Sequence, residues 1–132
     1  MAKPAYIWDG SSWVEITSAP GEAGTDLTST LDLSTITTNT TISDGTYVGK
    51  TLYCTNSSTI TITVNNDSST IPVGSQINII RYGSGAVNVA DGTATVNATP
   101  GQNLRARYSM ATLIKVVDGA TDEWLLVGDI SA

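Results

Sequence analysis

Carboxylates are the residues of this 132-residue chain with the clearest capacity for chemistry, because two of them suffice for glycoside hydrolysis. Most aspartates stand in turn sequences: Asp9, Asp44, Asp91 and Asp118 each precede a glycine, and Asp67 follows two asparagines. A tight turn explains that spacing. Asp122 and Glu123 are neighbours, so on a strand they point to opposite faces. Two turn aspartates can still meet at one end of a sandwich, which keeps a glycan-cleaving enzyme as the weakest alternative.

Other catalytic groups are scarce in this sequence. The chain has no histidine, which removes the commonest general base and a frequent metal ligand. Cys54 is the single cysteine, so it has no partner for a disulfide or a Cys–His dyad, and we expect it to be a small buried hydrophobe. Residues 65–69 supply oxygen ligands without the EF-hand order. The sequence therefore predicts no enzyme, no cofactor and no metal site.

Charge excludes two classes of partner. Acidic residues outnumber basic ones by 12 to 6, and only 14% of residues are charged, against about 25% in a typical soluble domain. The scattered cations are Lys3, Lys50, Arg81, Arg105, Arg107 and Lys115. They form no stripe that neutralises phosphates, and no apolar run approaches the length of a membrane span, so we expect neither nucleic acid nor membrane as partner. Thr and Ser supply much of the polarity, which suits a chain that packs against neighbours.

Two elements are predicted before the main domain. Residues 1–17 indicate an aromatic β-ribbon, with Tyr6 and Trp8 on one strand and Trp13 on the other, joined by a turn at Asp9-Gly10. A ribbon of two strands is marginal alone, so it packs either on its own domain or on a partner.

Residues 18–45 predict an extended, Thr/Ser-rich arm with one short strand around residues 31–36. Its sparse apolar residues include Leu27, Leu31, Leu33 and Ile36, which we interpret, with the three aromatic residues of the ribbon, as partner-binding positions.

Residues 46–132 predict a β domain. Apolar and polar residues alternate strictly over residues 59–64, and turn signals recur every 8 to 12 residues with no helical period. We expect an all-β, antiparallel sandwich or jelly-roll-like fold. Residues 104–108 are expected to be a strand, and Trp124 and Tyr108 to be core residues.

An ordered series of blocks resembles a β-rich module of tailed-bacteriophage virion proteins. The blocks are residues 71–77, Gly83-Ser84-Gly85-Ala86-Val87, residues 104–108, Ala111-Thr112-Leu113-Ile114-Lys115 and residues 124–129. The resemblance covers about residues 46–132. The opening residues 6–14 also resemble short aromatic ribbons of phage structural proteins.

The resemblance implies structural duty in a virion, commonly as a homotrimer. Because this chain has neither a long repetitive shaft nor a large attachment domain, we expect a small capsid decoration (cement) protein that binds the major capsid protein or another virion protein and stabilises the head shell. The alternative is a tail-fibre or spike-associated host-recognition module that binds surface glycan. Deleting residues 1–45 is expected to leave a folded β domain that no longer binds particles.

Overall fold

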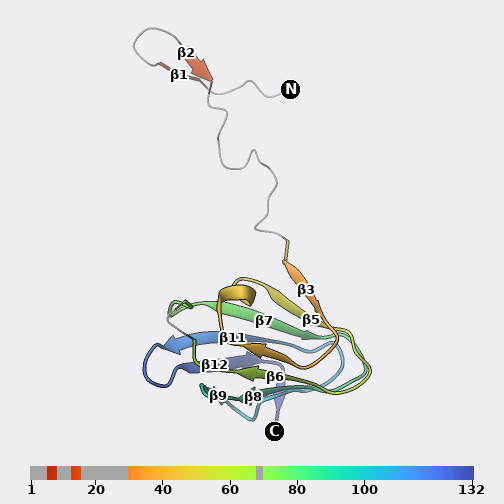
Figure 1. Ribbon diagram of the computed structural model, residues 1–132. Helices are drawn as coiled ribbons and strands as arrows, with labels where there is room; N and C mark the ends of the chain where they lie inside the picture. The colour runs from red at the N-terminus through yellow and green to blue at the C-terminus, as the bar shows by residue number, and fades with distance from the viewer. Residues whose placement is uncertain (1–5, 9–12, 16–29, 68–69) are drawn as a thin grey trace. The chain divides into compact units, whose positions relative to one another are not determined.

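The computed structural model describes residues 6–8, 13–15, 30–67 and 70–132 of the chain (Figure 1). The chain divides into two compact units, residues 1–31 and 32–132. Regular structure in the described residues is β, apart from a single 3-10 turn at Gly45–Tyr47, which the carboxylate of Asp44 caps at Thr46 N. No helix in this part of the chain is long and apolar enough to cross a membrane.

The first unit contains the expected ribbon. Strand β1 (Tyr6–Trp8) pairs antiparallel with β2 (Trp13–Glu15), and Trp8 lies opposite Trp13 in the register. The sequence prediction of a two-stranded ribbon is therefore confirmed.

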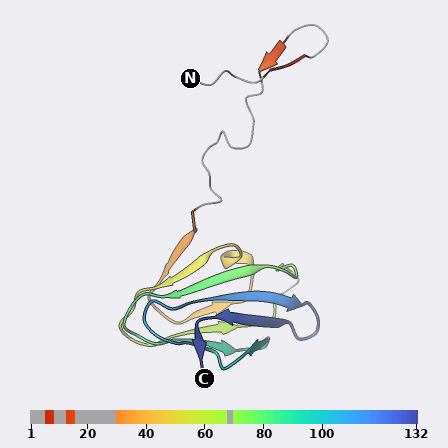
Figure 2. The same ribbon diagram turned by 180° about the vertical axis from the view of Figure 1, so that it is seen from behind.

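The second unit is a sandwich of two mixed sheets that lie one over the other (Figures 1 and 2). The six-stranded sheet contains, in spatial order, β3 (Leu33–Ile36), β5 (Thr51–Cys54), β7 (Gln76–Arg81), β11 (Met110–Val117), β12 (Glu123–Gly128) and β9 (Thr95–Ala98). The five-stranded sheet contains β13 (Ile130–Ser131), β10 (Asn103–Leu104), β8 (Val87–Asp91), β6 (Ile60–Val64) and β4 (Thr40–Ile42). The expected all-β sandwich is confirmed.

Strands β3 to β8 form a coil, because consecutive strands alternate between the two sheets. Strands β3, β5 and β7 are parallel neighbours in one sheet, and β4, β6 and β8 are parallel neighbours in the other. The connections also stack: Thr55 N donates to Ile36 O at 3.2 Å, and Tyr82 N donates to Cys54 O at 2.9 Å. Each parallel crossover is thus a strand of the opposite sheet, where α/β proteins use a helix.

The remaining strands close the two sheets. Strand β11 pairs antiparallel with β7 and β12, and β10 pairs antiparallel with β8 and β13, whereas β9 lies parallel to β12 at the sheet edge. The antiparallel, jelly-roll-like arrangement is therefore wrong for the coil. Alternation of apolar and polar residues sets which face a residue occupies, but it does not set strand direction.

One continuous core fills the space between the sheets. Alternate residues of each strand point inward, as in β6, where Ile60, Ile62 and Val64 are buried. Cys54 is 1% exposed, and burial raises the pKa of its thiol to about 11, so it behaves as the small hydrophobe that the sequence predicts. Trp124 is buried in the core, as expected.

The structure assigns part of the expected arm to the sandwich. Residues 33–36 and 40–42 are β3 and β4, which pair with β5 and β6. Ile36 and Ile42 belong to the core cluster, so the compact unit begins at Asp32, before the domain start expected at Thr46. Residues 18–29 of the arm lie outside the described residues.

Glycines in the stacked connections offer a test of the coil. Gly85 is buried, and a Cβ there would overlap the backbone carbonyl of Ser58 in the preceding turn. We expect Gly85→Ala to lower the free energy of unfolding by about 1–3 kcal/mol in urea denaturation, because two backbone segments must move apart.

The matched control is Gly119→Ala, since the nearest atom to its added Cβ is 3.8 Å away. This variant should stay within about 0.5 kcal/mol of the native protein. Equal stability of the two variants would contradict the close stacking of the coil.

Candidate assembly face

The outward side of the six-stranded sheet carries the most distinctive surface of the described chain, and we call its outward positions the assembly face. Strand register aligns most of these positions in three rows. The rows are Thr35, Tyr53, Ile80 and Met110; Leu33, Thr51, Asn78, Thr112 and Val127; and Gln76, Ile114, Leu125 and Asn97. No residue of these three rows carries a formal charge, whereas Glu123, the outward residue at the start of β12, adds a carboxylate that accepts a hydrogen bond from Asn97 Nδ2 at 3.3 Å.

Large apolar side chains are exposed on this face. Leu33 is 50% exposed, Val127 is 40% exposed, and Met110 and Leu125 are each 38% exposed. The outward residues of β4, β6, β8 and β10 in the opposite sheet are small and mostly polar: Thr41, Thr61, Thr63, Asn88, Ala90 and Asn103. Apolar exposure in the strands of the sandwich is therefore one-sided, which marks an interaction surface better than scattered single residues do.

Polar groups in the middle row bond to one another. Thr112 Oγ1 donates to Asn78 Oδ1 at 2.7 Å, and Asn78 Nδ2 donates to Thr51 Oγ1 at 3.4 Å. These side chains satisfy part of their hydrogen-bonding capacity within the sheet, which lowers the cost of covering the face.

The structure separates the partner-binding positions predicted from the sequence. Tyr6, Trp8 and Trp13 lie on the ribbon, and Leu27 lies outside the described residues. Leu31 is 54% exposed, and Leu33 lies on the assembly face. Ile36 is only 7% exposed and packs in the core, so its side chain stabilises the sandwich.

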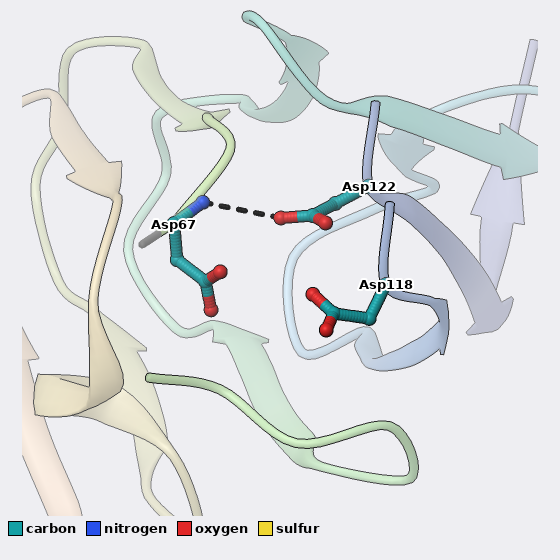
Figure 3. Close-up of side chains that lie close together, drawn as sticks. All are labelled: Asp67, Asp118 and Asp122. Atoms are coloured by element: carbon teal, nitrogen blue, oxygen red, sulfur yellow. Dashed lines mark hydrogen bonds between the residues drawn. The ribbon is translucent and has the colours of Figure 1, made fainter. Parts of the chain in front are cut away.

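A buried ion cluster forms at one end of the sandwich. Lys115 is fully buried, and its ammonium donates to Ile71 O at 2.7 Å and to Asp118 Oδ1 at 2.9 Å. The nearest oxygens of Asp67 and Asp122 lie 3.3 and 3.6 Å from Nζ. The three carboxylates converge from the loop after β6 and from the connection between β11 and β12, and Asp67 N donates to Asp122 Oδ2 at 3.1 Å (Figure 3).

Opposing effects set the charge states of the cluster. Burial favours a higher pKa for Asp122, but backbone N–H groups of Asp67 and Gly119 and the ammonium of Lys115 outweigh it and lower the pKa of Asp122. Burial favours a lower pKa for Lys115, but hydrogen bonds to Asp118 and Asp67 and the charges of Asp122 and Asp67 raise the pKa of Lys115. Asp122 and Lys115 are thus both held in their ionised forms.

The aspartates do meet at one end of the sandwich, as the sequence left open, but a lysine lies among them. Carboxylate oxygens of Asp67, Asp118 and Asp122 are close enough together to hold a cation. The Lys115 ammonium takes that position and supplies the compensating charge. The arrangement joins two loops to strand β11 and so has a complete structural explanation.

Sequence reasoning missed the role of Lys115, although a signal was present. On a strand over residues 110–117, the period of two puts Lys115 on the same face as Ala111 and Leu113, which are core residues. A lysine on a core face requires acidic partners, and the aspartates of the neighbouring turns provide them.

Three tyrosines gather at the rim of the assembly face, and with Arg107 we call them the tyrosine cluster. The ring centroids of Tyr53 and Tyr82 are 5.1 Å apart, and those of Tyr82 and Tyr108 are 5.7 Å apart. The Arg107 guanidinium lies 4.9 Å from the centroid of the Tyr108 ring, and its Nε donates to Tyr82 O at 2.9 Å. Burial raises the pKa of Tyr53, and the neighbouring Tyr82 adds to that rise.

The expected core position of Tyr108 is wrong. Strand β10 ends at Leu104, and a turn follows in which Ser109 N donates to Ala106 O at 3.1 Å. Tyr108 adopts a φ of 74° there and is 66% exposed. A bulky residue in this region of φ is a genuine outlier that costs about 1–3 kcal/mol, and such residues concentrate at functional sites.

Two comparisons with known proteins found no relative. No protein-family model matches the chain, and no curated protein matches it.

Replacing the cluster lysine tests the ion cluster. We expect Lys115→Met to lower the free energy of unfolding at pH 7 by about 3 kcal/mol or more, because Asp67 and Asp122 remain buried without a cation. The control is Lys50→Met, which removes a lysine that lies just before β5 and outside this cluster. This variant should change the free energy of unfolding by less than about 0.5 kcal/mol. Urea denaturation of both variants measures the difference, and equal losses would contradict the assignment.

The pH dependence of stability should also differ between the native protein and Lys115→Met. The lowered pKa of Asp122 stabilises the native protein above the unfolded value of about 3.9, and that contribution is lost as pH falls through the folded pKa. The raised pKa of Lys115 contributes fully below about 10.4 and is lost as pH rises through its folded pKa. Native stability should therefore be flat between about pH 5 and 9, whereas that of Lys115→Met should rise on acidification from pH 7 to 5.

Proposed function

We propose that this chain is a non-catalytic structural protein of a bacteriophage virion that assembles as a homotrimer through the assembly face. The observation that carries the proposal is the partly apolar outward side of the six-stranded sheet, whose three aligned rows hold no charged residue. The cores of protein interfaces are depleted in charged residues, and clustered exposed apolar side chains mark interaction sites. The resemblance of residues 46–132 to phage virion modules supports the same class of protein.

Within that class, we propose a capsid decoration protein that binds the major capsid protein or another virion protein. A cement protein stabilises a shell by mass action, because it binds the assembled state, and it needs repeated self-compatible surfaces more than a cleft. The ribbon of β1 and β2 offers a second, separate element for attachment. The protein would then be located in the virion, which is assembled in the host cytoplasm.

A charge placed on the assembly face tests the trimer. Leu125 lies in the third row of the face and is 38% exposed, so a lysine there fits the isolated fold but not a covered interface. We expect native protein to have the mass of a trimer in light scattering and Leu125→Lys to have the mass of a monomer, with an unchanged β-sheet circular dichroism spectrum.

The matched control is Thr61→Lys, an outward position of β6 in the opposite sheet. This variant should remain trimeric. A native monomer, or a trimer that survives Leu125→Lys, would overturn the proposed interface.

Removal of the first unit tests attachment. Deleting residues 1–45 would remove β3 and β4 together with core residues Ile36 and Ile42, so the informative deletion ends at Leu31. We expect residues 32–132 to keep the urea midpoint and trimeric mass of the full chain but to lose co-sedimentation with particles that lack the native protein. Full retention on those particles would contradict a role of residues 1–31 in attachment.

A second candidate function is host recognition at a tail fibre or spike through binding of surface glycan. The exposed tyrosine cluster favours it, since aromatic rings with a polar group at hand are common in binding sites. Copy number separates the two functions: a cement protein is present in many trimers per particle, whereas a tip protein is present in few.

A further inference from the structure

The tyrosine cluster has features of a prepared binding site, and these develop the second candidate function above. Its rings come from β5, from the residue after β7 and from the turn after β10. Tyr82 is 46% exposed and Tyr108 is 66% exposed, so two of the rings present area to solvent. An aromatic ring that combines exposed apolar area with a polar group suits contact with a ligand.

The turn that carries Tyr108 is held firmly. Tyr108 N donates to Arg81 O at 2.6 Å, and Ala106 N donates to Ser109 Oγ at 3.0 Å. Ser109 Oγ donates in turn to Asp129, which also makes a two-point pair with Arg105 at 2.6 and 2.9 Å. The backbone of a turn held in this way loses little conformational entropy when a ligand binds to the ring that it carries.

Charge at the cluster is opposite in sign to that of the chain. The net charge is −6, yet three of the six cations, Arg81, Arg105 and Arg107, lie within or beside the cluster. Arg105 is neutralised by Asp129, but no ion pair of Arg107 is found among the described residues.

The Arg107 guanidinium is oriented for an anion. Nε is occupied by Tyr82 O, and the described residues accept no further hydrogen bond from this group. Arg107 is an exposed residue, and its two terminal nitrogens are the pair of donors that can bind a carboxylate at two points.

We propose that Tyr82, Tyr108 and Arg107 form a binding site for a carboxylate-bearing saccharide. The apolar face of a sugar ring stacks on the exposed tyrosine rings, while the Arg107 guanidinium pairs with the carboxylate of the same or the next sugar unit. Neutral sugars offer only the first contact. The site recognises uronic or sialic acid units, and it requires no change in backbone conformation.

The test is titration of the full-length protein with three acidic probes: oligogalacturonate, hyaluronan oligosaccharide and oligosialic acid. Maltohexaose serves as the neutral probe. We expect at least one acidic probe to bind at least about tenfold more tightly than maltohexaose. Amide resonance shifts on binding should concentrate in residues 82 and 105–109.

Two variants remove the two contacts separately. Tyr108→Gly deletes the ring where glycine adopts the positive φ without cost, and Arg107→Gln deletes the charge. Each should weaken the acidic probe about tenfold or more, and Arg107→Gln should also abolish the preference over the neutral probe. Tyr108→Phe should retain binding, and Lys50→Gln, the control loss of one cation elsewhere, should leave affinity unchanged.

Three results would overturn the proposal: no binding of any acidic probe, equal binding of acidic and neutral probes, or equal affinity of native protein and Tyr108→Gly. Light scattering of the same variants keeps this test separate from the trimer. A fall from trimer to monomer in Tyr108→Gly would instead assign the cluster to contacts between copies of the chain.

Discussion

The alternation of β3 to β8 between the two sheets is the constraint on which the rest of this molecule depends. Because every turn of the chain adds one strand to each sheet, outward side chains of successive turns stack in register, about 4.8 Å apart. Charges of one sign would repel in such a stack, whereas threonine, asparagine and aliphatic residues do not. The small number of charged residues in the sequence is a consequence of this stacking as much as of any partner.

The same constraint produces two unlike surfaces. The five-stranded sheet presents small side chains such as Thr61, Thr63 and Asn88, while the six-stranded sheet adds β11 and β12 and with them Ile114, Leu125 and Val127. These antiparallel strands extend the apolar area that Leu33 and Ile80 begin on the coil. At one end of these strands, the buried ammonium of Lys115 forms ion pairs with Asp67, Asp118 and Asp122 and so holds two loops against β11.

Much of this fold follows from the sequence, and the exceptions have physical reasons. Strict alternation in residues 59–64 predicts β6, and the aromatic residues flanking Asp9-Gly10 predict the ribbon. Strand β4 was missed because Ile42 is its one apolar residue, and its stability comes from the parallel pairing with β6 that local sequence does not reveal. The assembly face depends on the register between strands that are distant in sequence, so the pattern of any single segment does not predict it. Tyr108 continued an alternating pattern that the turn after Leu104 interrupts.

The most direct test of the account is the solvent access of Met110 in the assembled protein. This thioether lies in the first row of the assembly face and is 38% exposed in the single chain, so peroxide should reach it unless another copy covers the face. Its oxidation, followed by peptide mass spectrometry, should be much slower in the native protein than in monomeric Leu125→Lys. Equal rates in the two proteins would contradict an interface on this side of the sheet.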